Sequence, residues 1–405
     1  MKPAHIFWIA PYFPFPPDSG AKVRIAGLIR HISNQYRISL IGMYEEHRDC
    51  APSSQDIVQA KRYFQTVRIF VRKFPYRGGV FSKLLYALFS PHPLYVVNYR
   101  IKGLREEVQK IIKEEGCDII QADEIYTAQY LFSLNRVKRV LILHNVDSLI
   151  FWRYFLHQAN IFRKVFFLIQ FFKMRRYEKK IIPKVDLTLC VSETDRKIFE
   201  KMFKEKVRIK VIPNGVDTEE IQSLPHSEKP VLIFIGIMNY QANVEAVESF
   251  LKKTYPLILE EIPNTFFYVV GANPSEKLIN WEEKYPVKFT GCVDNLIDWY
   301  KRAGVVIVPL KIGSGTRLKI LEAMAYGRPV VSTTLGAEGL EVTDGENILI
   351  ADSPKEFAEK VVTLLKNSAL YGKIIKNARN LVEEKYNWKG IAKRLAEEYQ
   401  TMLRD

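Results

Sequence analysis

A glycine-rich turn that leads into a helix is the first feature of this sequence whose residue types suggest chemistry. Such a turn exposes backbone N–H groups, and the first turn of a helix carries partial positive charge. Arg317 and Lys319 add two cations, and Glu322 follows Lys319 one helical turn later. We therefore expect an anion site, most naturally for a diphosphate, with Glu322 placed to accept hydrogen bonds from two ribose hydroxyls. The turn contributes four further candidates: Gly313, Ser314, Gly315 and Thr316.

Other interpretations of this segment are open. A capped surface helix with a Lys319–Glu322 pair would use the same residues. A dinucleotide fingerprint needs the pattern G-x-G-x-x-G, and Leu318 stands where the third glycine belongs, so hydride chemistry is disfavoured. The sequence contains no D-x-D pair, so we expect no metal held in that way and no cofactor.

Three further candidates stand near the ends of other expected strands. His144 ends an apolar run, where an imidazole can hydrogen-bond a ligand hydroxyl or pass a proton, although a structural role is the more common one. Arg153 could reach an anionic acceptor or simply lie on a helix. Gly20 closes a proline-rich loop and would let the backbone approach a phosphorylated ligand, or it is a plain turn glycine. We expect Lys22 and Arg24 to be divided between solvent and the ligand side.

Short β-branched runs alternate with helical stretches along the whole chain, which is typical of βαβ units. The predicted fold class is therefore α/β, with two doubly wound, Rossmann-like parallel-sheet domains facing across a cleft. Ligands of such sheets bind outside the carboxyl ends of the strands, where these candidates stand. The expected strands are residues 5–10, 37–42, 67–71, 118–122, 140–144, 186–191 and 207–212, then 230–236, 266–271, 287–291, 305–309, 329–333 and 348–351.

The two domains are predicted to meet at the sequence Ile-Pro-Asn-Gly-Val-Asp, whose turn residues could form a hinge. The first domain is expected at 1–212 and the second at 213–386. Apolar residues three to four positions apart predict a helix at 387–405, and this helix could cross back to the first domain.

The composition excludes several classes of protein. With 405 residues, 47% of them apolar and 12% aromatic, the chain is neither disordered nor fibrous. The four cysteines form no C-x-x-C pair, which argues against a disulfide framework or zinc knuckle and favours a reducing compartment. We expect no signal peptide, and no run of apolar residues reaches the ~18 that predict a transmembrane helix. The expected location is cytoplasmic, with peripheral attachment to the inner face of the plasma membrane as an option.

Positive charge is concentrated in the first half of the chain. Residues 1–210 carry 37 Lys and Arg against 19 Asp and Glu, a net +18, whereas residues 211–405 carry 23 against 26, a net −3. A basic half suggests a phosphorylated ligand, an anionic membrane or nucleic acid, and no nucleic-acid-binding motif accompanies the charge. Residues 161–180 hold seven Lys or Arg, one Glu and five Phe. They predict either an interfacial segment on anionic lipid or a core helix with a basic C-terminal end.

These motifs together resemble the retaining GT-B fold glycosyltransferases of family four over nearly the whole chain. The resemblance is strongest at residues 305–340, which contain the G-S-G-T-R-L-K loop of one subgroup. It implies that the second domain binds a nucleoside diphosphate sugar and that the first binds a glycan or lipid-linked acceptor, for which Arg153 is the candidate. Supporting matches are residues 11–24, 144–147, 191–193, 211–217, 236–247 and 291–294.

The resemblance also implies roles for single residues. Glu322 would hold the ribose, and Arg317 and Lys319 would neutralise the diphosphate. Gly20 matches the loop glycine near the phosphates, and His144 matches the acceptor-side histidine near the donor sugar. The expected catalytic residues are then His144, Arg317 and Lys319. Backbone around the base and phosphates would come from Gly236, Gly291 and Val293.

The sequence departs from the wider family pattern twice. The first glutamate of the usual E-x7-E pair falls on Ser314, and the usual R-x4-K pair falls near Met238 and Asn243. We infer that Arg317 and Lys319 supply the missing charge, and that Ser314 with nearby N–H groups touches the donor sugar.

The resemblance implies sugar transfer to an acceptor hydroxyl with retention, by front-face attack with the departing phosphate as base. Assembly of polysaccharide, lipopolysaccharide or lipid-linked glycan is the expected setting. Two other functions are open: a GT-B sugar-nucleotide epimerase, which needs no acceptor, and a scaffold that lost activity with the first glutamate. The retained residues that argue against a scaffold are His144, Arg317, Lys319 and Glu322.

Overall fold

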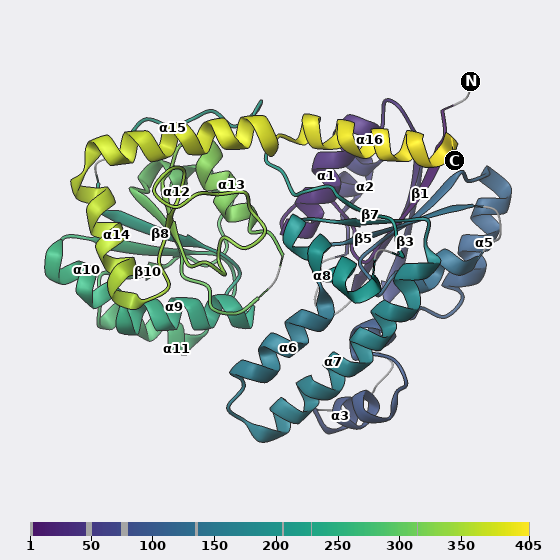
Figure 1. Cartoon of the computed structure of the whole chain (residues 1–405), viewed down its shortest axis with the longest axis horizontal. Coiled ribbons are helices and arrows are strands. Elements are labelled where there is room, and N and C mark those ends of the chain that lie inside the picture. Colours follow the sequence, from purple (N-terminus) through teal and green to yellow (C-terminus); the bar gives the residue numbers. More distant parts are fainter. Residues whose placement is uncertain are drawn as a thin grey trace. The chain divides into compact units, whose positions relative to one another are not determined.

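The computed structural model describes residues 3–45, 51–73, 80–133, 137–204, 206–227, 229–313 and 315–404. The chain divides into two compact units (Figure 1). Unit 1 consists of Met1–Asn214 with Trp388–Asp405, and unit 2 consists of Gly215–Asn387. The expected boundaries at 212 and 386 lie two and one residues before these limits, and the last helix is part of unit 1.

Unit 1 is built on a sheet of seven strands in the order β3-β2-β1-β4-β5-β6-β7, and every pairing is parallel. The strands are β1 (His5–Ala10), β2 (Arg37–Glu45), β3 (Thr66–Arg72), β4 (Ile119–Asp123), β5 (Lys138–Leu143), β6 (Leu187–Cys190) and β7 (Ile209–Val211). The helices are α1 (Gly20–Ile32), α2 (Ser54–Ala60), α3 (Val80–Phe89), α4 (Leu94–Asn98), α5 (Leu104–Glu115), α6 (Asp147–His157), α7 (Ile161–Ile181), α8 (Glu193–Phe203) and α16 (Trp388–Arg404).

The sheet of unit 1 is covered on both faces, which explains why β1 reads as an unbroken apolar run. All six β1 residues are buried. Trp8 belongs to a core with α1 and α16, and its neighbours Phe7 and Ile9 belong to the other core, with α5, α7 and α8. In the described ranges, no helix combines the length and apolar character needed to cross a membrane.

Helices α1 and α16 pack closely because α1 carries a glycine at the contact. A Cβ on Gly27 would lie 2.4 Å from the Trp388 ring, so any larger residue would force the helices apart. Trp388 thereby anchors the last helix at its first residue. This contact attaches α16 to the core that α1 forms with the sheet.

A buried arginine of α1 fastens the end of the first segment of unit 1. Arg24 donates to the carbonyl oxygens of Ile212 and Pro213, both at 2.7 Å, and to Asn214 Oδ1 at 2.9 Å. Its side chain is fully buried, so the expectation that Arg24 contributes charge to solvent or ligand is wrong. Three buried acceptors needed a donor, and Arg24 meets that need. Lys22 instead forms a surface pair with Asp18 at 2.9 Å.

Unit 2 is built on six parallel strands in the order β10-β9-β8-β11-β12-β13. Its two ends meet, since Val216 N donates to Tyr386 O at 2.8 Å and Val216 pairs with Asn387. The strands are β8 (Val231–Ile235), β9 (Phe266–Val270), β10 (Val287–Phe289), β11 (Val305–Val308), β12 (Val330–Ser332) and β13 (Leu349–Ile350). The helices are α9 (Gln241–Lys253), α10 (Tyr255–Glu261), α11 (Glu276–Ile279), α12 (Ile297–Arg302), α13 (Leu318–Ala325), α14 (Pro354–Lys366) and α15 (Ser368–Lys385).

The predicted fold class, two doubly wound parallel-sheet α/β domains, is confirmed, and each expected strand is present. The strand order reverses between β1 and β4 in unit 1 and between β8 and β11 in unit 2. At such a reversal, the segments that follow the two adjacent strands run to opposite faces of the sheet. A crevice therefore opens outside the carboxyl ends of these strands. Functional residues are therefore sought there.

We predict that Arg24→Ala lowers the free energy of unfolding by about 3 kcal/mol, because it leaves buried carbonyl oxygens without a donor. Urea unfolding followed by circular dichroism measures this loss. Lys22→Ala, which removes only a surface ion pair, should stay within about 0.5 kcal/mol of the wild type. Equal losses for the two variants would contradict the role given to Arg24.

Candidate active site

In unit 2, the loops after β8 and β9 come together at the strand reversal. Gly236 N donates to Val270 O at 2.9 Å, and a Cβ on Gly271 would lie 2.1 Å from the carbonyl oxygen of Gly236. A Cβ on Gly236 would in turn lie 2.7 Å from Asn243 Nδ2 and 3.0 Å from Lys319 Nζ. Glycine is needed at both positions because other groups already occupy the space. The backbone here lies directly beside the lysine of α13.

The ammonium group of Lys319 is the main cation of this site. Its Nζ lies 4.1 Å from the centroid of the Phe234 ring and 3.5 Å from Asn243 Oδ1. Burial, with a smaller contribution from the Arg317 charge, lowers the pKa of Lys319 to about 7, and Glu322 opposes the change. A cation that has lost much of its hydration gains strongly from an incoming anion.

Glu322 lies one turn further along α13. Tyr300 OH donates to Glu322 Oε2 at 3.2 Å. Burial raises the pKa of Glu322 to about 7, although Tyr300 and Lys319 both favour the ionised form. A carboxyl group in this state can accept hydrogen bonds from two neighbouring hydroxyl groups and gains from each of them.

The turn before α13 brings Arg317 back over its own backbone. Arg317 Nη1 donates to Gly315 O at 2.6 Å, and a Cβ on Gly313 would lie 2.7 Å from Arg317 Nη2. Gly313 and Gly315 have φ angles of 131° and 79°, which L side chains rarely adopt. The guanidinium is thus held at the start of the helix, and Thr316 lies half-buried beside it. Ser314 lies outside the described residues.

In unit 1, His144 is fixed by a buried carboxylate at the strand reversal. Its Nε2 donates to Asp123 Oδ1 at 2.5 Å, and Trp8 Nε1 donates to Asp123 Oδ2 at 3.0 Å. The other ring nitrogen lies 4.0 Å from Glu124 Oε1. Both nitrogens of His144 therefore face carboxyl groups, and the bond to Asp123 sets the orientation of the ring.

Buried carboxyl groups continue from this histidine into the α6–α7 hairpin. Glu124, with φ at +73°, is buried, and burial together with Asp147 and Asp123 raises its pKa well above the usual range. Burial and Glu178 raise the pKa of Asp147 to about 8, and burial raises that of Glu178 to about 7. Ser148 N donates to Glu178 Oε1 at 3.0 Å. The ligand side of unit 1 is acidic.

The other predicted residues lie apart from these groups or at their edges. Gly20 is exposed at the start of α1 in unit 1, and Arg153 is half-buried in the middle of α6. In unit 2, Gly291 pairs with Gly271 across the β9 and β10 loops, and Val293 follows it half-buried. Among the described residues, no three His, Cys, Asp or Glu side chains are arranged to hold a metal ion. The expectation that no metal takes part stays a prediction.

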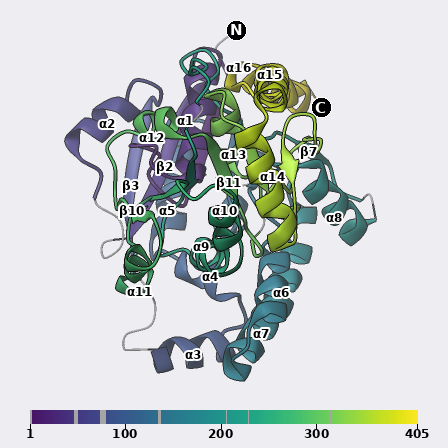
Figure 2. The ribbon, with the colours of Figure 1, turned by 90° about the vertical axis from the view of Figure 1, so that its left-hand side faces the viewer.

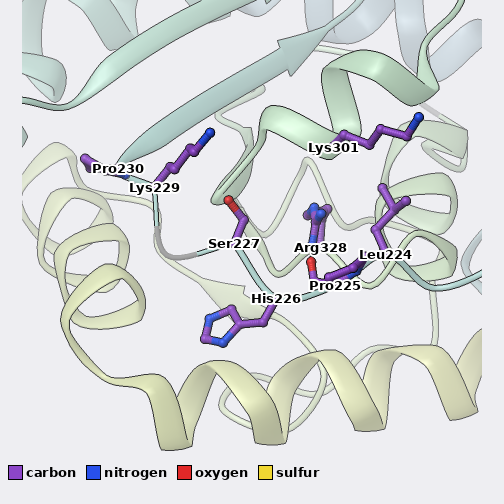
Figure 3. Close-up of a pocket in the computed structure, with 8 residues that line it drawn as sticks. All are labelled: Leu224, Pro225, His226, Ser227, Lys229, Pro230, Lys301 and Arg328. Carbon is purple, nitrogen blue, oxygen red and sulfur yellow. Dashed lines mark hydrogen bonds between the residues drawn. The ribbon is translucent and has the colours of Figure 1, made fainter.

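A separate hollow of about 880 Å³ opens at the other edge of the unit 2 sheet (Figure 3). Two residues that line it lie at the amino ends of strands: Pro230 comes directly before β8, and Arg328 comes two residues before β12. Arg328 donates to Tyr300 O and to Pro225 O, both at 2.7 Å. These bonds join loops of the fold, so the hollow does not qualify as the functional site.

Two family models match the chain. Residues 19–220 match a model described as Glycosyltransferase Family 4, and residues 229–367 match one described as Glycosyl transferases group 1. The chain belongs to the family 4 type of GT-B glycosyltransferases. The two matches follow the division into units and include every predicted site residue, from Gly20 to Glu322.

Individual proteins are similar over different lengths of this glycosyltransferase. A 44.6 kDa protein of the cps region of Klebsiella pneumoniae is 22% identical over 96% of this chain and 98% of its own length. Phosphatidyl-myo-inositol mannosyltransferase of Mycobacterium tuberculosis is 26% identical over 47% of this chain and 53% of its own. The structure of sucrose-phosphate synthase from Thermosynechococcus elongatus has a TM-score of 0.72 at 18% identity, with 99% of both chains covered. Anabaena HepE in complex with UDP has a TM-score of 0.66 at 15% identity, covering 98% of this chain and all of that one.

Sequence analysis missed several groups that the structure brings to these sites. Asn243 contacts Lys319, and Tyr300 bonds Glu322. Sequence analysis noted Asn243 only as a departure from the family pattern and did not single out Tyr300. Asp123 and Glu124 end β4, so the rule that selected His144 at the end of β5 could have found them. Asn243 occupies a position where the wider family pattern would place a cation.

Removing the half-buried charge of Lys319 should stabilise this glycosyltransferase. The folded-state pKa of Lys319, about 7, lies below the ordinary 10.5, so the charge costs stability in full below pH 7 and the cost fades as pH rises to 10.5. Lys319→Met should therefore gain about 2 kcal/mol at pH 6 and little at pH 10. Urea unfolding at both pH values tests this. Exposed Lys311→Met should show no such dependence, and a destabilised Lys319→Met would refute the assignment.

Asp123 should act as a positioning residue for His144. Asp123→Asn should lower kcat about tenfold or more with little change in donor KM, because the imidazole loses its fixed orientation. Steady-state kinetics of sugar transfer measure both constants. Trp8→Phe removes the other hydrogen bond to Asp123 and should leave kcat within about twofold. Equal kcat losses in both variants would reduce Asp123 to a structural role.

Proposed function

We propose that this glycosyltransferase moves a sugar from a nucleoside diphosphate sugar to an acceptor hydroxyl with retention at the anomeric carbon. The observation that carries the proposal is the pairing of Lys319 with Glu322 on the first turns of α13, one cationic and one carboxylic, beside glycine backbone. A nucleoside diphosphate carries the two groups that fit them, an anionic diphosphate and a ribose with neighbouring hydroxyls.

In this proposal, Lys319 and Arg317 bind the diphosphate and the start of α13 adds its partial positive charge. As the bond between the sugar and the phosphate breaks, negative charge grows on the leaving oxygen. Cations already placed there stabilise it without reorganisation. Lys319 takes up a proton when the anion binds at pH above 7, because the diphosphate restores the pKa that burial lowered. Glu322 accepts hydrogen bonds from the ribose hydroxyls and so fixes the position of the nucleotide.

We explain retention by attack of the acceptor hydroxyl on the face of the donor sugar from which the phosphate departs. The acceptor hydroxyl forms the new bond to the anomeric carbon as the bond to phosphate breaks, and a phosphate oxygen takes the hydroxyl proton. We assign His144 to the acceptor side of the donor sugar, with its ring oriented by Asp123. The phosphate oxygen is proposed as the base because it lies on the same face of the sugar as the attacking hydroxyl.

The acceptor is proposed to be a growing glycan or a lipid-linked glycan. The relative from the cps region and the phosphatidyl-myo-inositol mannosyltransferase support this class. HepE, with a similar fold, is described with bound UDP, which supports a nucleoside diphosphate at this fold. Polysaccharide, lipopolysaccharide or lipid-linked glycan assembly at the cytoplasmic membrane face is the proposed setting, and no cofactor is assigned.

A thermal-shift panel of sugar nucleotides and free nucleotides tests the donor site. One nucleotide family should raise Tm by several degrees, because a ligand at about 100 times its Kd adds about 2.7 kcal/mol of stability. Glu322→Ala should abolish the shift, and Glu276→Ala, an exposed glutamate of the same unit, should keep it. No shift with any nucleotide would overturn the proposal. Conversion of the bound sugar nucleotide without an acceptor would replace transfer by epimerisation.

A kinetic comparison separates donor binding from chemistry. Arg317→Ala should lower kcat by about 100-fold or more, since its charge opposes the negative charge that grows in the transition state. Arg302→Ala, which removes an exposed arginine at the end of α12, should retain wild-type kcat. Unchanged turnover in Arg317→Ala would remove Arg317 from the catalytic residues.

A further inference from the structure

Helices α6 and α7 form a long hairpin that extends from the sheet of unit 1 (Figures 1 and 2). Aromatic pairs fill the space between them: Trp152 with Phe171 at 5.1 Å, and Tyr154 with Phe167 at 5.1 Å between ring centroids. The hairpin therefore has its own apolar core. Further apolar residues on its surface are not needed for that core.

The hairpin nevertheless exposes large apolar side chains, at the start of α7 and in its middle. Phe162 is 77% exposed and Phe172 60%. Exposed residues of α7 recur at three- to four-residue spacing, so they line one outward face of the helix. The other exposed apolar residues of the hairpin are Leu156, Ile161 and Val165.

Helix α3 is fastened against α7 and adds to this surface. Lys173 Nζ donates to the carbonyl oxygens of Ala87, Leu88 and Ser90 at 2.6–2.8 Å, which satisfies the end of α3. Phe89, the last residue of α3, is left 82% exposed. Two faces of α7 are thus covered, by α6 and by α3, which explains the poor amphipathic pattern of residues 161–180.

Basic residues follow the apolar ones along α7. Arg175, Arg176, Lys179 and Lys180 are exposed, whereas the acidic residue among them, Glu178, is buried. Apart from exposed Arg163, the exposed part of α7 thus begins apolar and ends cationic. An apolar end that enters acyl chains, followed by cations at headgroup depth, fits an anionic lipid surface.

We propose that the free end of the α6–α7 hairpin, together with Phe89 of α3, docks this protein on an anionic lipid bilayer. The cations of the face favour an anionic partner, and its exposed phenylalanines favour lipid over a purely electrostatic partner such as nucleic acid. The hairpin begins at Asp147, three residues after His144, and Glu178 bonds Ser148 at its base. The docked hairpin therefore presents the acceptor side of the site to molecules held in the bilayer. Only this last step rests on the proposed function.

Co-sedimentation of the full chain with vesicles tests the docking without any sugar transfer. We expect binding to phosphatidylcholine vesicles that contain phosphatidylglycerol and little binding to pure phosphatidylcholine. Phe162→Ser should lower the partition coefficient about tenfold or more, and Arg176→Glu about fivefold or more. Ile279→Ser and Lys355→Glu, exposed residues of unit 2, are the matched controls and should bind as the wild type does. The Tm of each variant shows that it is folded.

Several outcomes would overturn the proposal. Equal binding to neutral vesicles, or binding that the hairpin variants leave unchanged, would place the contact elsewhere. A dimer that Phe162→Ser dissociates, with no vesicle binding, would make the face a contact between copies. Salt-sensitive retention on duplex DNA that Phe162→Ser leaves intact, again without vesicle binding, would assign the cations to nucleic acid. Nucleotide-induced thermal shifts are independent of all these results, so failed docking leaves the proposed function standing.

Discussion

The ammonium group of Lys319 is half-buried, so it needs charges and dipoles from the protein in place of water. The groups around it supply these only in part. Phe234 offers the face of its ring to Lys319, Asn243 offers an oxygen at the limit of hydrogen bonding, and Glu322 offers a carboxyl group whose own ionisation burial opposes. Gly236 lets the backbone come close enough to enclose the group. Burial disfavours the charged form of Lys319, and an anion would favour it, so this desolvation favours anion binding.

The groups at the two strand reversals do not follow the net charge of their own halves of the chain. The first 210 residues carry a large positive excess, yet two carboxyl groups, Asp123 and Glu124, lie beside His144 at the strand reversal of unit 1. The second half is slightly acidic, yet its strand reversal carries Lys319 and Arg317. Net charge therefore reports on the surface, here the hairpin of α6 and α7, and the sites follow local desolvation instead.

The sequence predicts the fold well because each parallel strand is buried on both faces and so appears as a separate apolar run. The candidate anion site can be proposed from the sequence for a related reason, since its turn, its cations and Glu322 are contiguous in the chain. Asn243, Tyr300 and Asp123 come from other elements, and only tertiary packing brings them near. Arg24 shows the limit clearly, because an arginine beside a loop looks like a solvent or ligand residue until the carbonyl oxygens it caps are seen.

The pairing of Val216 with Asn387 places the entry and the exit of unit 2 at one point. Unit 2 is thus one continuous segment of the chain, inserted between the main part of unit 1 and α16. The two ends of this segment lie side by side. Domains whose ends meet can be exchanged without rethreading either partner. A gene of this design can acquire a different second unit by recombination at two sites, while the closing helix, packed on Gly27, stays with the first unit.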